Sequence, residues 1–150
     1  MSRRVARLAP SLLGLALTAS AASACEGLRV ERAWLRLPPP GADVAAAYFE
    51  AINDGKAPLT ITGVASPGFG GGMLHAMALV DGQMRMRPQG DVVLAPGERF
   101  SAAPGGSHVM LWEAASPVTA DGDYRLTLTC AEGAPLTVPL PVRREAPPAP

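Results

Sequence analysis

The chain has 150 residues, with 13 basic and 13 acidic side chains and 48% hydrophobic residues. This length suits one domain with a single core. The chain has no strongly basic cluster, which argues against nucleic acid or an anionic lipid surface as a partner.

The first residues predict an export signal. Three arginines lie within residues 3–7, residues 12–22 form an apolar stretch too short to span a bilayer comfortably, and Ala22-Ser23-Ala24 fits an A-x-A cleavage site. We therefore expect residues 1–24 to be a signal peptide and the mature protein to be periplasmic, without a membrane span. Its removal leaves 10 basic and 13 acidic side chains, a mildly acidic mature chain.

Cys25 and Cys130 are the only cysteines in the sequence. An exported chain meets an oxidising compartment, so we expect a disulfide between them. The alternative is that Ala22-Ser23-Ala24-Cys25 acts as a loose lipobox, in which case Cys25 carries a lipid and Cys130 stays free.

Short β-type runs separated by turn residues follow along the chain. Such regular punctuation predicts an all-β protein, an antiparallel sandwich or barrel, without a long helix. The expected strands are 28–35, 46–53, 59–65, 73–80, 83–87, 91–94, 99–103, 108–113, 124–130 and 136–142. Residues 25–142 would form the folded domain, and the Pro-rich residues 143–150 a disordered tail.

Both histidines are followed two positions later by a methionine, in His75-Ala76-Met77 and His108-Val109-Met110. Side chains at i and i+2 of a strand leave the same face, so each tripeptide can present an imidazole nitrogen and a thioether sulfur together. If Asp81-Gly82 is a two-residue type I′ turn, Met77 faces Met86 across a hairpin, with His75 on the diagonal.

This combination of donors favours copper. Imidazoles and neutral thioethers, with no thiolate or carboxylate, suit a soft monovalent ion and above all Cu(I). Taken singly, a methionine on a strand is more often core filler, and Met73 is interpreted as the beginning of its strand. Met84 either packs or joins the site. Zinc would need Cys, His or carboxylate ligands, and no catalytic motif is present, so we expect no enzyme.

The order of these residues resembles the periplasmic copper chaperones called PCu(A)C, which share H-x-M, then M, then H-x-M at fixed spacing. Ten residues separate His75 from Met86, and twenty-one separate Met86 from His108. The similarity covers about residues 28–142. It includes the flanking segments Ala47-Tyr48-Phe49, Met84-Arg85-Met86-Arg87-Pro88 and Pro104-Gly105-Gly106.

The resemblance implies a cupredoxin-like or immunoglobulin-like antiparallel β-sandwich with Greek-key connections, a monomer that binds one Cu(I) per chain. By matching position the ligands would be His75, Met86, His108 and Met110, with Met77 as the adjacent methionine. It also implies copper delivery, directly or with a thioredoxin-like Sco protein, to the copper subunit of cytochrome c oxidase. The alternative is a non-enzymatic envelope sandwich domain whose Met-rich patch binds another protein.

Overall fold

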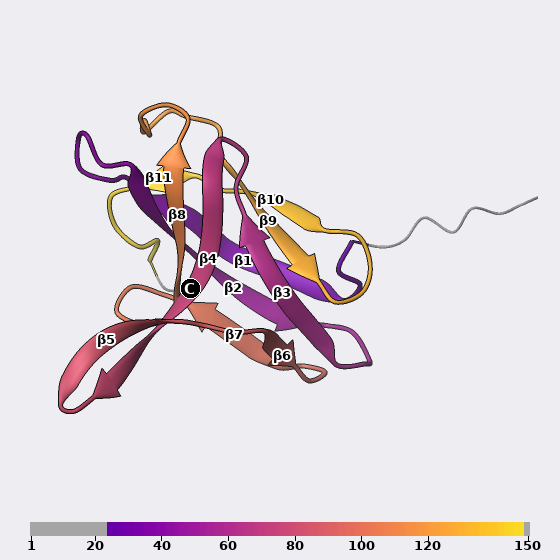
Figure 1. Cartoon of the computed structure of the whole chain (residues 1–150). Helices are drawn as coiled ribbons and strands as arrows, with labels where there is room; N and C mark the ends of the chain where they lie inside the picture. Colours follow the sequence, from indigo (N-terminus) through magenta and orange to yellow (C-terminus); the bar gives the residue numbers. More distant parts are fainter. Residues whose placement is uncertain (1–23, 149–150) are drawn as a thin grey trace, which may run out of the picture.

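The computed structural model describes residues 24–148, which form two β-sheets around one core (Figure 1). The predicted signal peptide therefore lies almost wholly outside the described residues. The strands are β1 (Leu28–Arg36), β2 (Val44–Asn53), β3 (Leu59–Ala65), β4 (Phe69–Val80), β5 (Gln83–Pro88), β6 (Val92–Leu94), β7 (Arg99–Ala102), β8 (His108–Ala114), β9 (Arg125–Cys130), β10 (Leu136–Pro139) and β11 (Val142–Arg143). Within the described part, no helix is long and apolar enough to cross a membrane.

The larger sheet has the strand order β11-β1-β2-β8-β4-β5, with β7 also paired to β2, and the smaller sheet has the order β10-β9-β3-β6. All named strand pairs are antiparallel except β1 with β11. The predicted antiparallel sandwich is confirmed. The segment expected as one last strand, 136–142, is divided into β10 and β11, which belong to different sheets.

The core lies between the two sheets because apolar side chains alternate along the strands. In β8, for example, Val109 and Leu111 are fully buried, whereas the residues between and beside them are partly exposed. The largest fully buried apolar side chains are Leu35, Phe49, Leu94, Val109, Leu111, Leu126, Leu128 and Leu140. Side chains on the other face of the larger sheet point away from this core.

Three glycines lie in β4 where it runs beside β8. The strand begins at Phe69, so residues 70–72 are part of the sheet rather than a flexible lead into it. A Cβ at Gly72 would stand 2.9 Å from Leu111 Cδ2 and 3.1 Å from the Val64 carbonyl oxygen, and one at Gly71 would collide with the indole ring of Trp112. Glycine is therefore what allows β4 to lie this close to its neighbours.

A disulfide between Cys25 and Cys130 ties the beginning of the described chain to the end of β9, with 5.5 Å between the two Cα atoms. The predicted pairing is confirmed in the structure. At the other end, Arg32 donates a hydrogen bond to the carbonyl oxygen of Pro147 at 3.0 Å. Residues after β11 are thus held beside β1 as far as this contact.

Candidate metal site

Six potential metal donors lie in three neighbouring cross-strand pairs. β4 aligns with β8 so that His75 is opposite His108, and it aligns with β5 so that Met77 is opposite Met86. On the other side of the histidines, Met73 is opposite Met110. A methionine pair therefore flanks the histidine pair on each side. We call these six residues the donor face: Met73, His75, Met77, Met86, His108 and Met110.

The donor face is on the side of the larger sheet that points away from the core. Where β4 runs beside β8, the residues that alternate with it are buried: Leu74 is 7% exposed, and Val109 and Leu111 are 0% exposed. By contrast, Met73 and Met86 are 43% and 44% exposed. Because side chains alternate along a strand, a metal ion on this face can be reached without opening the sandwich.

A tight turn fixes the position of Met86. Asp81 and Gly82, with φ values of 51° and 77°, form the two central residues of the β4–β5 hairpin, as a type I′ turn requires. The hairpin extends from the body of the molecule in Figure 1. Met84 lies opposite Leu79, nearer the turn, and is 57% exposed. The predicted hairpin register is confirmed in full.

The two imidazole rings are nearly parallel, with an interplanar angle of 20° and 5.9 Å between their centroids. His108 Nδ1 is 3.2 Å from the carbonyl oxygen of Gly106. If Nδ1 carries the proton and donates it there, Nε2 keeps its lone pair for a metal. His75 is 9% exposed, and its Nδ1 is buried without a hydrogen-bond partner. An unpartnered buried nitrogen is costly, and a bound metal is one way to satisfy it.

An aromatic pair lies on β1 and β2, on the side of β8 opposite to β4. Tyr48 follows Ala47, whose partner in β8 is Val109, the neighbour of His108. Tyr48 stacks on Trp34 with ring centroids 4.7 Å apart, and both residues are nearly buried. β2 changes partner at this point, from β8 to β7. The site therefore has a firmly packed neighbour on the β2 side and an open edge at β5.

The donor face carries no charged side chain. Among residues 24–148 there is no group of three or more His, Cys, Asp or Glu residues that could hold a metal ion. The main group of ion pairs lies on β1, β2 and β7 and in the turn after β2. There, a hydrogen bond from Arg29 holds the pKa of Asp54 below its usual range. The donor face therefore consists only of imidazole and thioether side chains.

All five site residues predicted from the sequence lie on the donor face, and Met73 is the member that the sequence prediction left out. Its position opposite Met110 depends on the pairing of β4 with β8, which no local sequence motif predicts. The strand expected from the sequence, 73–80, leaves out the glycines of residues 70–72. In the structure they belong to the strand that carries Met73 into the face.

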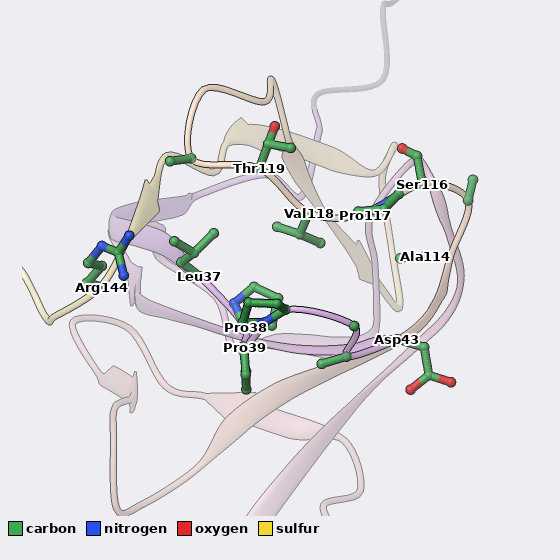
Figure 2. Close-up of a pocket in the computed structure, with 15 residues that line it drawn as sticks. Leu37, Pro38, Pro39, Asp43, Ala114, Ser116, Pro117, Val118, Thr119 and Arg144 are labelled. Atoms are coloured by element: carbon green, nitrogen blue, oxygen red, sulfur yellow. The ribbon is translucent and has the colours of Figure 1, made fainter.

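A hollow elsewhere on the described surface is not part of this site. It is a pocket of about 930 Å³ between the loops after β1 and after β8 (Figure 2). Leu37 and Val118 point into it, with Arg144 at one end and Asp43 at the other. It adjoins the end of β8 at Ala114, whereas His108 begins that strand, and no residue of the donor face lines it.

Comparisons with solved structures identify the same fold. The copper-bound PCuAC domain from PmoF2 has a TM-score of 0.64 and 27% sequence identity, over 84% of this chain and 98% of that chain. The apo PCuAC domain from PmoF1 has a TM-score of 0.66 at 24% identity, over 83% and 99% of the two chains. Apo-DR1885 from Deinococcus radiodurans has a TM-score of 0.63 at 21% identity, over 97% of each chain. The resemblance to PCu(A)C proteins is confirmed.

Sequence comparisons name a family. A curated relative, "Putative lipoprotein Lxx21020" of Leifsonia xyli subsp. xyli (strain CTCB07), is 29% identical over 149 residues, which cover 93% of this chain and 89% of the relative. The sequence model of the LpqE-like family, described as "Putative lipoprotein LpqE-like", matches residues 28–142. This match spans most of the chain, including the whole donor face. The chain therefore belongs to the LpqE-like family and has the fold of the PCuAC domains.

Proposed function

We propose that this protein is a Cu(I)-binding metallochaperone of the cell envelope. The observation that carries the proposal is the pairing of its two histidines on an exposed sheet face, between two pairs of methionines. The ligands are His75, Met86, His108 and Met110, with Met77 beside Met86, and they hold one Cu(I) per chain. The copper-bound PCuAC domain from PmoF2, at 27% identity, supports this choice of metal.

The chemistry of the donors favours Cu(I) over other ions. Thioethers are soft and neutral, so they suit a monovalent soft ion and contribute little to the binding of Zn(II), which prefers Cys, His and carboxylate ligands. The unpartnered His75 Nδ1 is consistent with a ring that meets a metal. The nitrogen of each imidazole that binds copper must be unprotonated, whereas the thioethers do not titrate.

The position of the site suits transfer rather than permanent storage. Met86 lies on β5, an edge strand in which every residue is exposed. A partner's thiolates could approach from this edge and replace the thioethers one at a time. Copper would then leave by ligand exchange, without a change in the protein's own oxidation state. This protein would act as a carrier and not as an enzyme.

We further propose that the acceptor is the copper subunit of cytochrome c oxidase, reached directly or with a thioredoxin-like Sco protein. This acceptor follows from the resemblance to PCu(A)C chaperones. Export is supported by the basic and apolar leader sequence and by the family's description as lipoproteins. Cys25 can carry a lipid only when its sulfur is not joined to Cys130, so the disulfide-bonded protein is proposed to be unlipidated.

Anaerobic titration of the disulfide-bonded mature protein with Cu(I), and separately with Zn(II), tests the metal assignment. Native mass spectrometry should find one Cu(I) per chain and little retained Zn(II). Met84→Leu is the matched control, because Met84 is an exposed methionine of the same hairpin and should leave copper binding intact. Equal uptake of Zn(II), or no uptake of copper, would refute the chaperone and leave the exposed methionines as a protein-binding patch.

A further inference from the structure

Met73 has the same relation to one histidine that Met110 has to the other. The two methionines are directly opposite each other, and so are the two histidines, in adjoining positions of the β4–β8 pair. Met110 is therefore diagonal to His75, and Met73 is diagonal to His108. Side chains on such diagonals have Cα atoms about 7–8 Å apart, within the reach of a long flexible thioether.

We propose that Met73 is a further copper-binding residue, a thioether that can replace Met110 on the same Cu(I). This inference rests on the proposed function and adds a ligand to that site. The exchange is a substitution of one neutral sulfur lone pair for another, so no proton or electron is transferred. Copper keeps its two imidazoles during the exchange, and the number of bound ions stays at one.

The surroundings of Met73 argue against a purely structural role. Its side chain is 43% exposed, while the adjacent Leu74 is 7% exposed and supplies the contact with the core. The next cross-strand pair along the sheet is Gly71 with Trp112. The Trp112 indole lies against Gly71, and this bulky ring borders the methionine pair on the side away from the histidines.

Met84 provides a control within the same chain. It is 57% exposed and lies on the same side of the hairpin, so its environment is close to that of Met73. However, it is opposite Leu79, and the pair of Met77 and Met86 separates it from the histidines. Exposure alone would make these two methionines equivalent, whereas the proposal makes only Met73 a ligand.

The direct experiment is nuclear magnetic resonance of the mature protein labelled with ¹³C at the methionine methyl groups, titrated anaerobically with Cu(I). Single Met→Leu variants assign the five methyl signals. We expect the signals of Met73, Met86 and Met110 to move with copper while that of Met84 stays. If Met86 and Met110 respond but Met73 does not, this inference is wrong and the proposed function stands. If no copper is bound and no methyl responds, the proposed function itself fails.

A double-mutant cycle measures the replacement. Met73→Leu should lower Cu(I) affinity only about two- to fivefold, because Met110 remains, and Met110→Leu should be partly compensated by Met73. The double variant should lose at least about tenfold more affinity than the product of the two single losses. Leucine keeps the apolar volume, and thermal unfolding checks that each variant is folded. Losses that simply multiply would contradict the exchange of Met73 with Met110.

Discussion

Replacing Met86 by alanine should separate copper binding from folding. Met86 is 44% exposed, so the sheet buries about half of its side chain. Complete burial of a methionine is worth about 1.5–3 kcal/mol, which puts the cost of this truncation at about 1 kcal/mol. For a domain of this size, that corresponds to a fall in Tm of about 3–5 °C. Loss of one of the four proposed copper donors should lower Cu(I) affinity about tenfold or more.

Leu111→Ala is the matched comparison, because Leu111 is 0% exposed and faces the core between two positions of the same exposed face. Its truncation should cost about 2–5 kcal/mol and lower Tm by about 8–20 °C. The folded fraction should still bind copper almost as tightly as the original protein. The assays are thermal unfolding by circular dichroism and anaerobic competition with a chromogenic Cu(I) chelator. A Met86→Ala variant that loses as much Tm as Leu111→Ala, with unchanged copper affinity, would refute the assignment of Met86 as an exposed ligand.

Three further predictions concern pH and the disulfide. Copper affinity should decline from about pH 7 to pH 5, where histidine side chains generally take up a proton. A series of chelator competitions at different pH values measures this decline, which should be smaller in His75→Met. An affinity that does not change with pH would exclude histidine ligands. The Cys25–Cys130 bridge closes a loop with a sequence separation of 105, so a Cys25→Ser/Cys130→Ser variant should have a free energy of unfolding about 4–5 kcal/mol lower, measured with denaturant. Intact mass with and without reductant checks the bond. A lipid on Cys25 would contradict it. Arg29 lowers the pKa of Asp54, so this pair should stabilise the fold at any pH above the ordinary aspartate pKa of about 3.9. The stabilisation should be lost as the pH falls through the lowered pKa of Asp54. Asp54→Asn should therefore unfold more easily at pH 7 and equally easily at pH 2, and a constant difference in Tm would contradict the pairing.

The parts of the fold that could be predicted from the sequence depend on local chemistry. Asp81-Gly82 specifies a type I′ turn between two alternating runs, so the hairpin register and the facing of Met77 and Met86 follow from adjacent residues. The disulfide was predictable because only two cysteines exist in a chain whose first residues predict an export signal. The relation to PCu(A)C proteins was predictable because His75, Met86 and His108 have a specific spacing.

The parts that could not be predicted depend on contacts between distant segments. Nothing near His75 or His108 in the sequence indicates that they face each other, because this requires the alignment of β4 with β8. The same alignment gives Met73 its place opposite Met110. The division of residues 136–142 between two sheets likewise depends on β1 and β9 as partners, and neither is local to that segment.

The location of the disulfide has a consequence for competition over the metal. Cys130 ends β9 of the smaller sheet and is buried in the core with Cys25, while the donor face is on the far side of the larger sheet. A thiolate would outcompete thioethers for Cu(I), so a free cysteine of this chain near the donor face would retain the copper and oppose its transfer. In this protein both sulfurs are joined in the disulfide, and the larger sheet lies between them and the donor face. In the proposed transfer, any thiolate that meets copper on this face therefore belongs to another molecule, because this chain has no free cysteine among its described residues.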